Sequence, residues 1–167
     1  DDLRAALWAR FERHLCPDAL RRHLRLLPDF DDIEAEDAAR AHILKFQPIE
    51  HALLYCLQAP DLALGAQIVT TRFSEIDGEA YDILTPFADT VLPEHPLVAV
   101  LLWRSMIDFA LSYARSGRYR HAARHLASCA DADALIADYG EHPSHDSYVQ
   151  GLRQAHGRKS AFWKRWC

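Results

Sequence analysis

The apolar residues of this chain recur at helical spacing from one end to the other. Leu3, Leu7, Phe11 and Leu15 form the first stripe, and residues three or four positions apart share one face of a helix. No segment alternates between apolar and polar residues as a half-buried strand would. Prolines and glycines mark the turns between stripes. The sequence therefore predicts an all-α fold of about eight to ten helices, joined in antiparallel pairs by short turns.

Caps and breaks predict where several of these helices begin and end. Asp61 and Ser144 suit the N-cap position, where a side-chain oxygen accepts a hydrogen bond from a free backbone N–H. Gly78 breaks the chain before another helix. The longest helix is expected from about Leu97 to Ala114, and it is apolar nearly all round in its first turns. A helix of that kind is typical of the middle of a domain.

Length and charge limit the classes of protein to which this chain can belong. A length of 167 residues fits one domain, and we expect a single all-helical domain over residues 1–167. The formal net charge of −5 gives no general attraction to nucleic acid or to anionic lipid. No segment approaches the roughly 18 apolar residues that a membrane-spanning helix needs, so we expect no membrane partner.

Cysteine spacing and residue usage suggest the setting of the protein. The cysteines at positions 16, 56, 129 and 167 show no C-x-x-C spacing, which favours reduced thiols in a cytoplasmic protein over a disulfide framework. Basic residues are mostly arginine and alanine is abundant, a bias that suggests a GC-rich bacterial genome. The chain also begins without a methionine, inside an amphipathic pattern. We therefore expect the C-terminal part of a longer bacterial, cytoplasmic protein.

The segment 106–129 carries the pattern of a helical hairpin. Ala110 and Ala122 are small residues at which two helices can approach closely, and Tyr113 and Tyr119 are placed to fill the gap beside them. The segment resembles a tetratricopeptide-type hairpin at Phe109, Ala110, Tyr113, Gly117, Tyr119, Ala122 and Leu126. The proline that usually closes such a repeat is absent. The resemblance implies an irregular tetratricopeptide-like helical repeat, in which stacked helix pairs form an α-α superhelix.

Four segments connect the chain with a family of proteins. They are LRLLPDFDDIEAED at 24–37, HPLVAVLLWRSMIDF at 95–109, RYRHAARHL at 118–126 and HGRKSAFW at 156–163. Through them the chain resembles an uncharacterised bacterial family of helical proteins. The resemblance covers the body of the chain and implies the helical fold and a bacterial cytosolic setting, but no activity.

Three potential metal ligands recur at one helical spacing. His121, His125 and Cys129 occupy positions i, i+4 and i+8, so they project from one side of a helix. Two helical histidines with one further ligand can hold zinc, and a metal-binding protein is therefore one alternative. The stripe also lies beside the core face of Ala122 and Leu126, where histidines usually hydrogen-bond to neighbouring turns. We favour structural histidines and expect no cofactor.

The chain ends in HGRKSAFWKRW, residues 156–166, where arginine and lysine are interleaved with Phe162, Trp163 and Trp166. Such a pattern can bind single-stranded nucleic acid through phosphate contacts and base stacking. The three aromatic residues also fall on one side of a short terminal helix, and such a helix most often docks onto the fold. We favour docking, with a nucleic-acid-binding module as the alternative.

No set of residues in the sequence identifies a reaction. Nothing marks a nucleophile on a sharp turn or an oxyanion-forming glycine, and the six acids within residues 28–37 are typical of a solvated helix start. We therefore favour a non-catalytic helical-repeat scaffold that binds a protein or peptide. The polar part of its binding surface is expected at Arg118, Tyr119, Arg120, Arg124, Arg153, Arg158 and Lys159.

Overall fold

The all-α prediction is confirmed. The computed structural model describes residues 1–166, and these contain ten α-helices, two short 3₁₀ helices and no strand. Contacts within the chain define two compact units, unit 1 (Asp1–Arg72) and unit 2 (Phe73–Cys167). The single domain expected over residues 1–167 stays a prediction.

Unit 1 contains five helices around a small core. They are α1 (Asp2–His14), α2 (Pro17–Arg25), α3 (Asp31–Lys45), α4 (Ile49–Gln58) and α5 (Leu62–Thr71). Pro17 is the first residue of α2, where a missing N–H is tolerated. The carboxylate of Asp61 caps α5 by accepting a hydrogen bond from the Leu64 N–H at 3.2 Å, which confirms the predicted cap. In the core, the fully buried Phe11 ring lies 6.1 Å from the Tyr55 ring, centroid to centroid.

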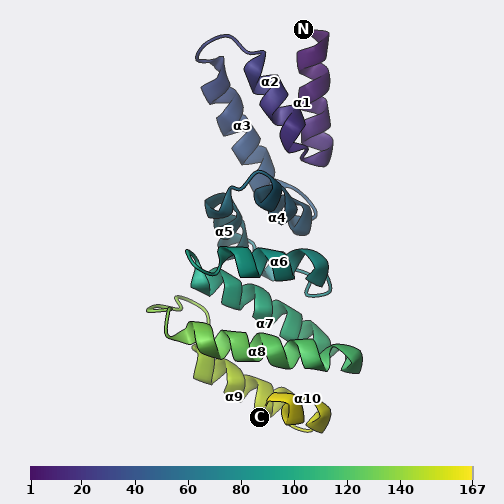
Figure 1. The fold of residues 1–167 in the computed structure, drawn as a ribbon, viewed down its shortest axis with the longest axis vertical. Coiled ribbons are helices and arrows are strands. Elements are labelled where there is room, and N and C mark those ends of the chain that lie inside the picture. Colours follow the sequence, from purple (N-terminus) through teal and green to yellow (C-terminus); the bar gives the residue numbers. More distant parts are fainter. Residues whose placement is uncertain (167) are drawn as a thin grey trace. The chain divides into compact units, whose positions relative to one another are not determined.

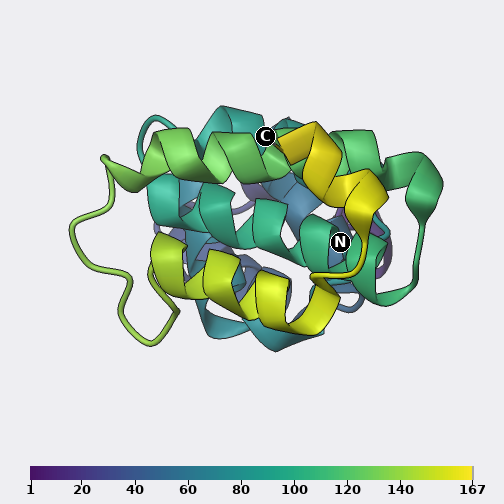
Figure 2. The same cartoon turned by 90° about the horizontal axis from the view of Figure 1, so that it is seen from below.

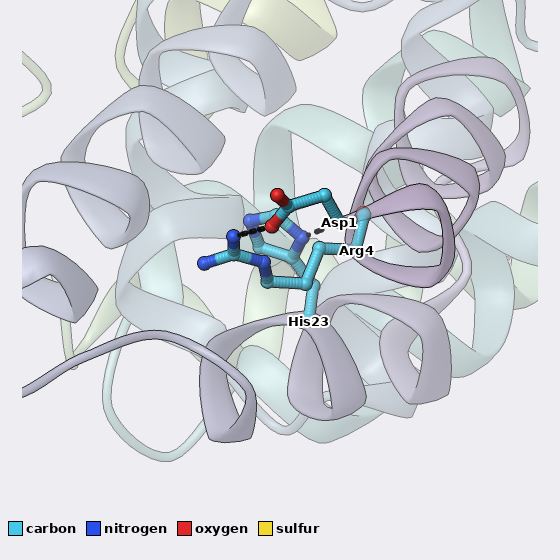
Figure 3. A network of polar contacts seen from close by, with 3 residues as sticks. All are labelled: Asp1, Arg4 and His23. Atoms are coloured by element: carbon cyan, nitrogen blue, oxygen red, sulfur yellow. Dashed lines mark hydrogen bonds and ion pairs between the residues drawn. The ribbon is translucent and has the colours of Figure 1, made fainter.

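Polar groups connect the start of α1 with α2. The Arg4 guanidinium pairs with the carboxylate of Asp1, and Nδ1 of His23 donates a hydrogen bond to the Arg4 backbone carbonyl at 2.9 Å (Figure 3). The His23 ring also lies 5.2 Å from the Trp8 ring, centroid to centroid. His23 thus binds a backbone carbonyl and packs on an aromatic ring, which is a structural role.

Unit 2 stacks its helices in successive layers. They are α6 (Tyr81–Val91), α7 (Pro96–Ser112), α8 (Tyr119–Asp133), α9 (His145–His156) and α10 (Ser160–Trp166), with the 3₁₀ helices η1 (Phe73–Glu75) and η2 (Ser116–Arg118). α7 packs between α6 and α8, and α10 packs against α8 (Figure 1). A long loop joins α8 to α9 and extends past their ends (Figure 2). Short turns make α6 and α8 antiparallel to α7, so α6 and α8 run in the same direction.

α7 is the central helix of unit 2, as its apolar sequence predicts. Residues 98–104 of this helix are all buried, and Ile107 and Leu111 are fully buried farther along. It begins at Pro96 and ends at Ser112, within two residues of the expected bounds. Within residues 1–166, no helix combines the length and the apolar character that crossing a membrane requires.

The α7–α8 hairpin has the turn and the small residues that the sequence predicts. Ala110 and Ala122 are both buried, and η2 forms the turn. Tyr119 is 5% exposed and therefore fills a gap in the core as expected. The same expectation for Tyr113 is wrong, because this side chain is 66% exposed. α7 ends one residue before it, and the left-handed backbone of Ala114 (φ 50°) then turns the chain away.

The C-terminal helix α10 docks onto the fold, as favoured from its sequence. The side chain of Phe162 is 0% exposed and that of Trp163 is 8% exposed. The Phe162 ring meets the Tyr119 ring of α8 edge to face at 6.1 Å. The indole N–H of Trp163 donates to the His156 carbonyl at 2.9 Å, which satisfies its one polar group. The docked rings therefore close the C-terminal side of unit 2.

The cysteines within residues 1–166 are free thiols, as expected. Cys16 is partly exposed, whereas Cys56 and Cys129 are buried. Burial raises the pKa of both buried thiols to about 12, so they stay protonated and unreactive at neutral pH. Cys167 lies outside the described residues.

Candidate binding groove

Three helices of unit 2 enclose a cavity of about 580 Å³. α7 supplies its floor, while α6 and α8 supply two facing walls. The volume falls within the range of protein ligand pockets, roughly 300–1,000 Å³. We call this cavity the groove.

The floor of the groove is apolar. Trp103, Met106 and Ala110 of α7 line it, one on each successive turn of the helix. The Thr85 hydroxyl of α6 donates to the Met106 sulfur of this floor at 3.4 Å. Such a floor favours contact with apolar side chains.

The α6 wall carries acidic and hydrogen-bond-accepting groups. Asp82 and Asp89 both line the groove, because residues seven apart lie on one face of a helix. Pro86 lies between them within α6. Proline has no N–H to donate to the carbonyl of the residue four positions earlier, so the Asp82 carbonyl lacks its usual helical partner. This wall was missed from the sequence, although the seven-residue spacing of its two acids was a usable signal.

The α8 wall carries basic and imidazole groups. α8 presents His121, Arg124, His125 and Ser128, which recur every three or four residues, and Arg118 at the end of η2 extends this wall. At the N-terminal ends of the walls, the Arg118 guanidinium lies over the Tyr81 ring of α6, 4.1 Å from its centroid. This cation–π contact links the two walls across one end of the groove.

The structure brings two of the seven predicted binding residues into the groove. Arg118 and Arg124 line the α8 wall. Arg120 is exposed but lies outside the lining, and Tyr119 points into the core instead of toward the groove. The predicted cluster is therefore divided, because neighbouring residues of one helix point in different directions.

The remaining predicted residues belong to the C-terminal end of unit 2. The Arg153 guanidinium lies over the Trp163 ring at 4.3 Å from its centroid, so it covers the docked α10. Arg158 and Lys159 occupy the turn between α9 and α10. These three cations lie apart from the groove lining.

The three residues considered as metal ligands do not converge. His121 is exposed and lines the groove, whereas Cys129 is fully buried in the core. Positions i and i+8 differ by roughly 80° around a helix of 3.6 residues per turn, which explains this divergence. Within residues 1–166, no group of three or more His, Cys, Asp or Glu side chains is placed to hold a metal ion. The described residues therefore give no support to the alternative of a metal site at His121, His125 and Cys129, which stays a prediction.

His125 contributes to the groove as a neutral imidazole. Burial, together with the neighbouring His121 and Arg124, lowers the pKa of His125 from 6.5 to about 4. Its Nδ1 is buried and has no hydrogen-bond partner within the described chain. The folded state therefore keeps this ring uncharged at neutral pH.

The stability of unit 2 is expected to fall as the pH drops from 6.5 toward 4. In that window the unfolded chain protonates His125 while the folded state does not, so protons favour unfolding. The stability that the neutral His125 ring contributes is fully present above pH 6.5 and amounts to about 2–3 kcal/mol. Urea titrations across this window should show a shallower loss of stability in His125→Asn than in the wild type. Equal slopes for the two proteins would contradict the neutral, buried state of His125.

A second polar cluster surrounds Arg104, which interrupts the apolar run of α7. Arg104 is only 3% exposed. Its Nη1 donates to the Pro143 carbonyl at 2.7 Å, and its guanidinium lies over the rings of Tyr139 and Tyr148. The Tyr148 hydroxyl in turn donates to Asp108 at 2.7 Å. Arg104 thus anchors the long loop between α8 and α9 to α7, and it lies outside the groove lining.

Comparison with known proteins leaves the groove without an assigned ligand. No curated protein and no solved structure matches the chain. The model of one family, a family of unknown function (DUF6880), matches residues 1–165. The match covers both units and therefore agrees with the resemblance to an uncharacterised family. The chain belongs to the DUF6880 family.

Proposed function

We propose that this chain is a non-catalytic helical-repeat scaffold whose groove binds a segment of another protein. The successive helix pairs of unit 2 and the resemblance of the α7–α8 hairpin to a tetratricopeptide unit support a repeat. Stacked helix pairs build continuous surfaces of this kind. In this proposal the scaffold acts in a bacterial cytosol, as its residue usage and its scattered cysteines suggest.

The observation that carries the proposal is an apolar groove with unpaired charges on its walls. Asp82 and Asp89 face the groove from one side, and Arg118 and Arg124 from the other. Within residues 1–166, none of the four forms an ion pair. Charges that a fold leaves unpaired beside an apolar floor are available to select a partner by complementarity.

The alternative of a nucleic-acid module has weaker support, and the buried cysteines do not favour catalysis. Two of the three aromatic residues in the basic tail, Phe162 and Trp163, are buried, so their faces are not available for base stacking. The groove contains two carboxylates, which would repel phosphates. The buried thiols of Cys56 and Cys129 stay protonated at neutral pH, which makes them poor nucleophiles.

A selection of random peptides displayed on phage against the purified chain tests the proposal. Enriched peptides should bind the wild type, and Arg124→Glu should weaken that binding about tenfold or more, since it replaces a cation of the groove by an anion. Fluorescence anisotropy with the labelled peptides measures the dissociation constants. Arg120→Glu is the matched control, because it makes the same charge change on the same helix outside the groove.

Two results would contradict the proposed function. One is a selection that yields no peptide whose binding depends on Arg124. The other is an equal loss of binding in Arg124→Glu and Arg120→Glu, which would indicate a general electrostatic effect of α8. Thermal unfolding of Arg124→Glu and Arg120→Glu tests whether each change leaves the fold intact.

A further inference from the structure

The two walls of the groove carry charges of opposite sign. Asp82 and Asp89 are two helical turns apart, about 10 Å along α6, whereas Arg118 ends η2 directly before α8 and Arg124 lies in the second turn of α8. α6 and α8 run in the same direction, and the contact of Arg118 with Tyr81 places their N-terminal ends together. Each acidic group therefore faces the basic wall across the α7 floor.

The floor determines which backbone conformation a bound segment can adopt. An extended segment would place its backbone N–H and C=O groups over Trp103, Met106 and Ala110, which offer no backbone partner. Unpaired backbone groups on an apolar surface are costly. An α-helix satisfies these groups internally and can present an apolar stripe to the floor. The floor thus favours a helix over a strand.

The walls determine the side chains on the flanks of that helix. The α6 wall offers the carboxylates of Asp82 and Asp89. These groups all accept hydrogen bonds, so they select lysine or arginine. The α8 wall offers the guanidinium groups of Arg118 and Arg124, which select carboxylates.

We propose, as a consequence of the proposed function, that the groove binds an amphipathic helix with flanks of opposite charge. Its apolar stripe faces α7, its basic flank faces α6 and its acidic flank faces α8. Basic residues seven positions apart match the spacing of Asp82 and Asp89, because the partner helix has the same rise per residue as α6. The partner is therefore a helix whose three faces are apolar, basic and acidic.

Synthetic alanine-based helical peptides with one shared leucine stripe test this inference. The mixed peptide carries lysines on one flank and glutamates on the other, and two further peptides carry only glutamates or only lysines. Anisotropy titrations at low salt should give about tenfold tighter binding for the mixed peptide, because each single-sign peptide meets one wall of like charge. A mixed peptide interrupted by a central proline should bind at least tenfold more weakly, since it cannot form the helix.

Reversing the charge of the α6 wall should change which peptide binds most tightly. In Asp82→Lys/Asp89→Lys both walls are basic, so the all-glutamate peptide should become the tightest binder by about tenfold. Glu94→Lys/Glu141→Lys is the control, because it makes the same change in net charge at exposed positions outside the groove. This control should keep the wild-type preference for the mixed peptide.

Three results would overturn the inference. They are equal binding of the mixed peptide and its proline-interrupted form, equal binding of the three helical peptides to the wild type, and an unchanged preference in Asp82→Lys/Asp89→Lys. If none of the helical peptides binds while phage-selected peptides bind in an Arg124-dependent manner, the inference fails and the proposed function stands. Failure of the phage selection itself would overturn both.

Discussion

Replacing Phe162 with alanine is expected to lower the free energy of unfolding of unit 2 by about 3–5 kcal/mol. The Phe162 ring is fully buried, and it packs edge to face on Tyr119 of α8 and at 4.9 Å from Trp163. Truncation removes the apolar contact of the ring and leaves a cavity that the short α10 cannot fill. Urea denaturation followed by circular dichroism measures the loss.

Lys164→Ala is the matched control for this prediction. Lys164 lies on the same short helix but is exposed, so its truncation should change stability by no more than about 0.5 kcal/mol. Hydrogen exchange distinguishes loss of the whole unit from release of α10 alone, because local release would deprotect only the amides of α10. A loss of less than about 1 kcal/mol in the free energy of unfolding for Phe162→Ala, with no deprotection of the α10 amides, would contradict the docked state of α10. The aromatic tail would then again be a candidate for binding nucleic acid.

Features that depend on neighbouring residues could be predicted from the sequence. The Asp61 and Ser144 caps and the turn at η2 are local, and the structure shows all three. The docking of α10 was also predictable, because Phe162 and Trp163 share a side of a short helix with few other ways to bury two rings. Local chemistry thus predicts which segments are helices and which of their faces are apolar.

The groove depends on contacts between distant segments, which is why its acidic wall was missed. An exposed helix normally carries charges on one face, so Asp82 and Asp89 alone do not indicate a binding site. They become a wall only because α7 packs between α6 and α8 and holds them opposite Arg118 and Arg124. No periodicity within α6 or α8 contains that information.

The burial of Arg104 in the core also depends on contacts between distant segments. In the sequence it marks the end of the apolar run in α7, yet it is buried. Its guanidinium donates one hydrogen bond to the Pro143 carbonyl and lies over the rings of Tyr139 and Tyr148. These partners lie 35 or more positions along the chain, so composition around Arg104 could not predict them.

Replacing Gly78 with alanine is expected to destabilise unit 2 by about 3 kcal/mol. A Cβ atom at this position would overlap the backbone oxygen of Ser105 and lie 2.7 Å from Cβ of Phe109, closer than real Cβ atoms come to their neighbours. Both obstacles belong to α7, the central helix, whose backbone cannot shift without disturbing its packing against α8. The segment before α6 would have to move away, and the α6 wall of the groove would move with it.

Gly151→Ala provides a control that should change stability in the opposite direction. Gly151 lies within α9, is exposed, and would place a Cβ atom in open space. Alanine at such a helical position should stabilise the protein by about 0.5–1 kcal/mol, because glycine loses more backbone entropy on folding. Urea denaturation of the two variants measures the size and the sign of each change in the free energy of unfolding. A neutral effect of Gly78→Ala would contradict the close packing of this segment on α7, and with it the placement of the α6 wall opposite Arg118 and Arg124.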